Sequence, residues 1–377
     1  MSRLILALTL ALVACASGPR RPGTSPRNAP PSLEELAARL DWASSPRLPS
    51  PTSATYRLLP QPPRDPMVAP LVAGLSYDGR LAAGAAGMAL VIAEDVGTFT
   101  RWEVREALWR GGWPYPVDSA RSWSAPPIGG PPPECLEWIR TIPKDEPMAL
   151  VRARGRGGEI WVGMRTRQPV DLGSIPRMTE QGTKVPFPAV PGAELRVADG
   201  NGRMSRTPMD EPVTVSLTMP GEWLVQVVQD GSELARFPIY VGINPPEEPV
   251  LRLPEYRVTD QVEGAARQLD LLLQRARQHL GRPRWSRDDI LDLGARRFVS
   301  SPERGVAEIL AGLGFQDADA EVWACTEASI EDCVDRWYWD PRRRDAWHAR
   351  RIFGYGAHGT MDARGVSFTV LLVEEPE

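Results

Sequence analysis

The sequence predicts a multidomain α+β protein with three folded parts: a small helical unit, a β-sandwich and a C-terminal α-β-α sandwich. Three observations support this division. Apolar residues recur at helical spacing in residues 67–125, short apolar runs alternate with turn residues in 148–243, and helical and strand-like segments mix in 255–377. A chain of 377 residues is long enough for two or three domains.

The first fourteen residues have the pattern of an export signal. Arg3 is followed by an uncharged apolar run from Leu4 to Ala14, which is shorter than the roughly 20 residues that span a bilayer. The run ends Leu-Val-Ala directly before Cys15, and this ending resembles the lipobox of bacterial lipoproteins. The resemblance implies that residues 1–14 are removed and that Cys15 is lipidated. The alternative is an ordinary secretory signal with a cysteine there by chance.

A lipidated Cys15 holds the protein on a membrane. Acylation of this kind places two or three chains on one residue, and each buried CH₂ contributes about 0.8 kcal/mol, so the anchor is stable. The Pro-rich residues 15–66 are then expected to form a tether. We therefore expect a lipid-anchored protein of the bacterial cell envelope, held at the outer membrane and either periplasmic or surface-exposed, whose first partner is the membrane.

Residues 67–125 are expected to form the helical unit. Apolar side chains recur there every three or four residues, at Leu81, Ala85, Met88 and Ile92. Residues 148–243 change character, because valine-rich runs are separated by turn residues such as Pro220-Gly221, which is typical of a β-sandwich. The expected strands are 150–153, 160–164, 195–197, 213–217, 223–228 and 239–241.

Residues 255–377 combine helices with a small sheet, as in an α-β-α sandwich. Gly281 is expected to end the first helix, and Ser329 to cap the fourth. The expected elements are, in order, a helix over 259–280, a second over 286–299, a third from 302, a strand over 322–325, a fourth helix after 329, and a hairpin over 352–373.

The net charge bears on the expected partners, and the cysteines bear on possible disulfides. The net charge of −4 gives no reason to expect a nucleic-acid partner. Of the four cysteines, Cys15 is assigned to the lipid. Cys325 and Cys333 flank a short segment and can form a disulfide if their geometry allows, which leaves Cys135 unpaired. Free buried thiols at Cys325 and Cys333 are an equally good interpretation.

Several motifs follow one another in the last third of the chain. They are Leu-Leu-Gln-Arg-Ala-Arg at 272–277, Gly-Arg-Pro-Arg-Trp at 281–285, Ala-Glu-Val at 320–322, Trp-Tyr-Trp-Asp-Pro-Arg-Arg-Arg at 337–344 and Gly-Tyr-Gly at 354–356. Their order resembles the CAP superfamily, named after cysteine-rich secretory, antigen-five and pathogenesis-related proteins. Together with the β-rich segment before it, this part resembles the exported multidomain CAP lipoproteins of myxobacteria.

The resemblance implies a cleft that lacks the two histidines of intact family members. Intact family members bring two histidines and acidic residues together, a set that can hold a divalent metal. Here Arg343 occupies the second histidine position, and the expected helix over 286–299 contains no histidine. Arginine is always protonated and cannot be a ligand. We therefore expect a degenerate CAP-like domain without a cofactor, whose candidate cleft residues are Glu321, Trp337, Arg343 and Asp345.

Three functions are compatible with this interpretation, and one of them is a structural envelope protein with no small ligand. The leading hypothesis is non-enzymatic binding of a glycan, a lipid or a protein at the envelope, with no catalytic residue. The alternative is a metal-dependent hydrolase with a rebuilt site, in which His348 and His358 join Glu321 and Asp345 as ligands. Motifs such as Gly-x-Ser-x-Gly and His-Glu-x-x-His are absent from the sequence. The run Arg342-Arg343-Arg344, with aspartates around it, predicts a solvated, salt-bridged face.

Overall fold

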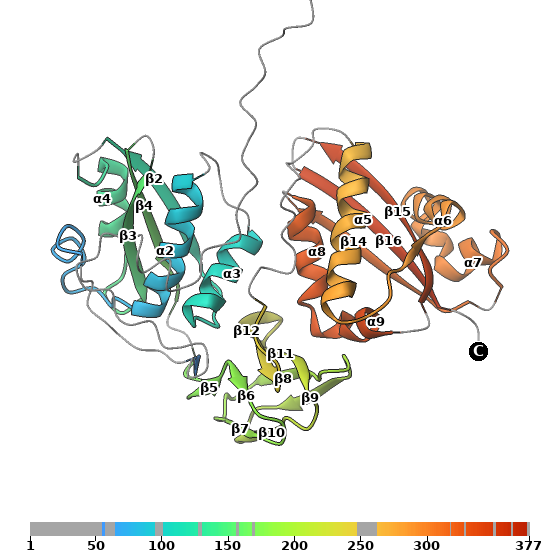
Figure 1. Ribbon diagram of the computed structural model, residues 1–377, viewed down its shortest axis with the longest axis horizontal. Helices are drawn as coiled ribbons and strands as arrows, with labels where there is room; N and C mark the ends of the chain where they lie inside the picture. Colours follow the sequence, from blue (N-terminus) through green and yellow to red (C-terminus); the bar gives the residue numbers. More distant parts are fainter. Residues whose placement is uncertain are drawn as a thin grey trace, which may run out of the picture.

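The computed structural model describes residues 55–56, 65–94, 101–126, 130–155, 158–167, 170–246, 262–316, 318–327, 329–349, 352–362 and 365–374. The export signal, Cys15 and most of the expected tether lie outside these residues and stay predictions. Within the described part of the chain, no helix is both long and apolar enough to cross a membrane. Figure 1 shows three bodies, which we name the N-terminal unit (65–167), the β-domain (170–246) and the C-terminal domain (262–374).

The N-terminal unit is a three-stranded antiparallel sheet with helices packed on it. Its strands are β2 (Ser119–Ala125), β3 (Met148–Gly155) and β4 (Gly158–Arg165), in the order β2-β4-β3. Its helices are α2 (Gly79–Glu94), α3 (Arg101–Gly111) and α4 (Pro133–Arg140). Helix α2 packs on β3 and β4, and Trp138 of α4 packs over Gly163 of β4. Gly84 and Gly111 let α2 and α3 approach closely, since a Cβ on Gly111 would lie 2.7 Å from the Gly84 nitrogen.

This part of the chain is divided differently from the sequence-based expectation. The strands expected at 150–153 and 160–164 exist, but they pair with β2 and not with the strands of the β-sandwich. The unit expected over 67–125 is therefore not purely helical, because Ser119–Ala125 is a strand of the same sheet. Strand pairing depends on distant partners, and nothing in the local residue pattern of 148–165 distinguishes the two sheets.

The β-domain contains a five-stranded sheet and a two-stranded one. The larger has the order β6 (Met178–Thr179), β12 (Ser232–Val241), β11 (Gly221–Gln229), β8 (Ala193–Ala198), β9 (Met204–Pro208). The smaller pairs β7 (Lys184–Phe187) with β10 (Val213–Ser216), and Val185 and Phe187 are buried. A short pair, β1 (Thr55–Tyr56) with β5 (Ile175–Pro176), ties residues 55–56 to this body through the Tyr56 hydroxyl, which donates to the Pro238 carbonyl at 3.1 Å.

The C-terminal domain has helices on both faces of a four-stranded sheet. The sheet order is β13 (Ser286–Arg287), β15 (Ile352–Asp362), β16 (Gly365–Glu374), β14 (Ala320–Glu327). One face is covered by α5 (Val262–His279) and α8 (Ile330–Tyr338), and the other by α6 (Asp289–Ser300) and α7 (Val306–Ala311). Between them lie the 3₁₀ turns η1 (Pro302–Arg304) and η2 (Pro341–Arg343) and the short helix α9 (Arg344–His348).

The predicted fold class, a multidomain α+β protein, is confirmed, including the layered C-terminal domain. The Ser329 hydroxyl caps α8 as expected, because it accepts a hydrogen bond from the Asp332 amide at 3.1 Å. The third expected helix begins as the turn η1 and continues as α7 only after Gly305. Cys325 and Cys333 are joined by a disulfide with their Cα atoms 5.7 Å apart, and Cys135 is a buried free thiol.

Candidate functional site

Three of the four candidate cleft residues lie near one another at the edge of β14. Glu321, on that strand, and Asp345 are exposed, and Arg343 in η2 is half-buried. The Arg343 guanidinium lies 5.4 Å from the ring centre of Trp323, and its Nε is 3.5 Å from an Asp340 carboxylate oxygen. The result is a small charged surface against the buried indole of Trp323. We name Glu321, Arg343 and Asp345 the charged rim.

At the charged rim, the carboxyl groups of Glu321, Asp340 and Asp345 surround one guanidinium, that of Arg343. Partial burial raises the pKa of Glu321 above its ordinary value, and the Asp340 and Asp345 charges act in the same direction. The Arg343 guanidinium opposes this rise. Its Nη1 is buried and has no hydrogen-bond partner among the described residues. Arg343 therefore retains donor capacity that its neighbours do not use.

Trp337 does not line a cleft. It is only 1% exposed and belongs to an aromatic cluster with Trp285, Trp323 and Trp347 in the core of the domain. Its indole N–H donates to the Ala324 carbonyl at 3.4 Å, and its own carbonyl accepts from the Trp347 indole at 3.1 Å. The prediction that Trp337 contributes to a binding surface is wrong, because a large aromatic side chain gains more from being fully buried.

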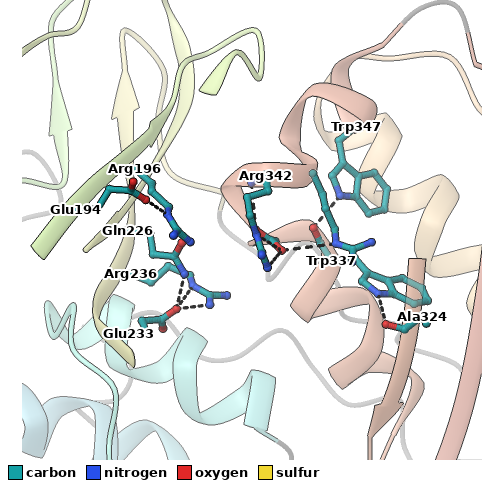
Figure 2. Close-up of polar contacts among 11 residues, drawn as sticks. Glu194, Arg196, Gln226, Glu233, Arg236, Ala324, Trp337, Arg342 and Trp347 are labelled. Carbon is teal, nitrogen blue, oxygen red and sulfur yellow. Dashed lines mark hydrogen bonds and ion pairs between the residues drawn. The ribbon is translucent and has the colours of Figure 1, made fainter. Parts of the chain in front are cut away.

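The turn η2 that carries Arg343 packs against β8 and β11 of the β-domain. Figure 2 shows Arg342 facing the β-domain side chains Arg196 and Gln226, with Trp337 on its other side. Arg342 remains exposed and forms an ion pair with Asp340 at 2.8 Å, which agrees with the solvated face predicted for the arginine run. The segment expected to border a cleft is thus largely used to join two domains.

Arg344, by contrast, is completely buried at this junction. Its Nη2 donates to the Glu222 carboxylate of β11 at 2.7 Å, and the two side chains are 0% and 2% exposed. The Tyr338 hydroxyl donates to the same carboxylate at 3.0 Å. The guanidinium also lies 4.7 Å from the centre of the Tyr338 ring. The prediction of a solvated face is wrong at this residue.

The junction holds Glu222 as a carboxylate. Burial alone would raise the pKa of Glu222, but the charges and hydrogen bonds of Arg344 and His279 outweigh it and lower the pKa to about 2. His279 takes part through its Nε2, which is 3.4 Å from the second carboxylate oxygen. A buried charge of this kind is tolerated only because each of its oxygens has a partner.

Gly202, in the β8–β9 turn, fits the β-domain to α9. Its φ is +86°, and a Cβ there would lie 2.4 Å from the Arg344 carbonyl oxygen and 2.8 Å from the His348 ring. Only glycine adopts this backbone without strain and leaves that space free. The close approach therefore fixes where Arg344 and His348 stand relative to the sheet.

His348 is held among arginines and not among carboxylates. Its Nδ1 is 3.4 Å from an Arg282 nitrogen, and since a guanidinium only donates, Nδ1 accepts and Nε2 carries the proton. Burial, followed by the charges of Arg344 and Arg282, lowers the pKa of His348 to about 3. The same positive charges would repel a metal ion.

The other metal-ligand candidates are not brought together. His358 lies in β15, where it pairs with Thr369 of β16. Within the described ranges, no three His, Cys, Asp or Glu side chains gather as a metal-ligand set. The rebuilt site proposed from Glu321, Asp345, His348 and His358 therefore has no geometric support.

The N-terminal unit reaches the same region of the molecule. Arg105 of α3 forms an ion pair with Asp335 of α8, and the rings of Trp109 and Trp339 meet edge to face with centres 4.6 Å apart. The Trp109 indole also donates to the Arg236 carbonyl of the β-domain at 2.7 Å. All three bodies consequently share one continuous buried core.

The solved structures that resemble this chain include two with low TM-scores. An outer surface protein from Borrelia burgdorferi aligns with a TM-score of 0.27 and 12% identity, over 31% of this chain and 96% of that one. A cysteine-rich secretory protein from Staphylococcus aureus aligns with a TM-score of 0.26 and 9% identity, over 51% of this chain and 85% of that one. No protein-family model and no curated protein matches the chain. Membership of the CAP superfamily therefore stays a proposal from the motifs.

Sequence reasoning missed Glu222 and Arg344, the most deeply buried ion pair of the junction. Glu222 follows a turn, at Pro220-Gly221, where a charged residue is usually solvated. No local signal marks Arg344, because α8 ends at Tyr338 and the turn at Pro341–Arg343 interrupts the helical spacing before it.

Replacing Arg344 with methionine is expected to destabilise the protein strongly. Arg344→Met removes one partner of a buried pair and leaves Glu222 charged and unpaired, which costs about 3–5 kcal/mol of unfolding free energy. The matched control is Arg342→Met, which breaks an exposed pair and costs about 1 kcal/mol or less. Urea unfolding followed by tryptophan fluorescence measures both. Equal effects of the two substitutions would contradict a buried junction.

Acid is expected to weaken the same junction. The pKa of Glu222 is about 2 in the folded protein against an ordinary 4.5, so its stabilisation is complete above the ordinary value and disappears as the pH falls toward 2. Unfolding free energies of the wild type and Glu222→Gln are measured from neutral pH downward. At neutral pH the variant has a lower unfolding free energy than the wild type. Acidification lowers the unfolding free energy of the variant by about 3 kcal/mol less than that of the wild type. Parallel acid profiles of the two proteins would refute this role for Glu222.

Proposed function

We propose that the protein is a lipid-anchored protein of the bacterial cell envelope. The support is the export-signal pattern of residues 1–14, directly before Cys15, and the Pro-rich composition of residues 15–66. The disulfide between Cys325 and Cys333 agrees with this location, because disulfides persist in oxidising compartments outside the cytoplasm. The outer membrane is the proposed place of the anchor.

The proposed activity is non-enzymatic binding by the CAP-like C-terminal domain. The observation that carries it is Arg343, which places a permanent positive charge beside Glu321 where the family resemblance calls for a metal-binding histidine. The exposed carboxylates of Glu321 and Asp345, with the half-buried guanidinium of Arg343 beside them, suit recognition of a polar ligand. A glycan, a lipid headgroup or a protein surface meets this requirement.

The close packing of the three bodies against one another supports the same function. The N-terminal unit, the β-domain and the C-terminal domain are joined by buried aromatic and charged contacts such as Trp109–Trp339 and Glu222–Arg344. A rigid body presents the charged rim in one fixed orientation, so binding there requires little ordering of the protein. A hydrolase would need a nucleophile or metal at the same place, and His348 is surrounded by arginines instead.

Lipidation at Cys15 is testable directly. Cells that express the full chain are expected to incorporate labelled palmitate into the wild type, because acylation of lipoproteins uses the lipobox cysteine. Cys15→Ser is expected to lose the label and to appear in the soluble fraction. The control is Cys135→Ser, which changes a buried thiol and keeps the label. Label that persists in Cys15→Ser would show that the acyl group is attached to another residue and would contradict the assignment of Cys15.

Metal analysis separates binding from metal-dependent hydrolysis. The full chain carrying Cys15→Ser is purified, equilibrated with zinc, dialysed and analysed for metal. We expect less than one zinc per chain and no change in His348→Ala/His358→Ala, since the arginines near His348 repel a cation. Stoichiometric zinc that disappears in the double variant would replace the binding proposal with the hydrolase.

A further inference from the structure

A recess on the outer side of the C-terminal domain is lined by residues other than those of the charged rim. It has a volume of about 460 Å³ and lies where α6 meets η1. Figure 1 shows α6 and α7 at the side of this domain that faces away from the N-terminal unit. The residues that line the recess from these elements are mainly Leu293, Arg296, Arg297, Ser300, Ser301 and Arg304.

The sequence of α6 explains why these side chains converge. Positions 293, 296, 297 and 300 are spaced by three and four residues, so they share one face of the helix. The chain then continues through Ser301 into η1, which brings Arg304 back beside the last turn of α6. Two guanidiniums from the helix and one from the 3₁₀ turn therefore border a single hollow.

The recess is positively charged. Arg304 is paired with Glu308 at 2.9 Å. Among the described residues, no carboxylate oxygen lies within 4.0 Å of a guanidinium nitrogen of Arg296 or Arg297. The carboxyl end of α6 contributes only about half a negative charge. Three guanidiniums outweigh Glu308 and the helix end together, so the hollow attracts anions.

The number of donors points to the kind of anion. One guanidinium is enough to satisfy a carboxylate in a bidentate pair. The guanidiniums of Arg296 and Arg297, with that of Arg304 shared with Glu308, match a group with more charge and more acceptor oxygens. The Ser301 side chain adds a hydroxyl donor at the same place. We propose that the α6–η1 recess binds a phosphate group.

The surface next to the recess suits a phosphate that is attached to an apolar body. Leu293 is 41% exposed at its edge, and Ile290, one turn earlier on α6, is 50% exposed. A helix face with arginine at one end and exposed Ile and Leu at the other is suited to a phospholipid headgroup and the acyl region below it. A free phosphate ion would use the arginines alone. This site is distinct from the charged rim, and it holds whether or not the rim binds a ligand.

Vesicle and phosphate binding test the proposal on the full chain carrying Cys15→Ser, so that no acyl anchor contributes. One arm measures co-sedimentation with vesicles of phosphatidylcholine mixed with phosphatidylglycerol, against phosphatidylcholine alone. The other arm measures binding of inorganic phosphate by calorimetry. Arg296→Gln/Arg297→Gln is expected to bind roughly thirtyfold more weakly, because two surface arginines are lost. The matched control, Arg203→Gln/Arg206→Gln, removes the same charge from exposed residues of the β-domain.

The outcomes distinguish a lipid phosphate from a soluble phosphate. They also show which results overturn the proposal. Loss of vesicle binding only in the α6 variant supports a lipid headgroup as the ligand. Loss of inorganic phosphate binding only in that variant supports a soluble phosphate. Absence of binding in both arms, or an equal loss in the β-domain control, overturns the proposal, since general electrostatic attraction would then account for the result. All four arginines are exposed, and thermal unfolding checks that the variants fold.

Discussion

The buried ion pair between Glu222 and Arg344 is the contact on which the arrangement of the molecule depends. It lies where the β-domain meets the C-terminal domain, and neither side chain is accessible to water. Two charges leave water only when the attraction between them and their other hydrogen bonds compensate for lost hydration. Tyr338 and His279 complete those hydrogen bonds, so the pair fits in one relative position of the two domains.

The geometry of the candidate site depends on this junction. Because Arg344 is held by Glu222, the turn η2 directly before it lies against the β-domain, and Arg343 is turned toward Trp323. His348, one turn further along α9, is brought under Gly202 and among arginines. The same contact thus explains why Glu321 meets a guanidinium and why His348 is unsuited to a metal.

Much of the fold was predictable because its signals are local. Ser329 caps α8 through its own hydroxyl, and the final hairpin is evident from two apolar runs with a short turn between them. The strand Ser119–Ala125 was not predictable, since five of its seven residues are serine or alanine and its only large apolar side chain is Trp123. The site was harder still. Trp337 and Arg344 are two residues whose burial depends on partners that local spacing does not reveal, and each was given the opposite environment.

The distance along the chain between Glu222 and Arg344 has a consequence for how the protein acquires its shape. They are separated by 122 residues, and closing so long a loop has a large entropic cost. The sheet around β11 pairs with partners nearer in the chain, β8 and β12, so we expect it to form before Arg344 docks. We therefore expect Glu222 to stay hydrated on the β-domain until the last part of the chain docks. A polypeptide that ends before residue 344 leaves that carboxylate without its guanidinium, and its β-domain keeps an open, hydrated face.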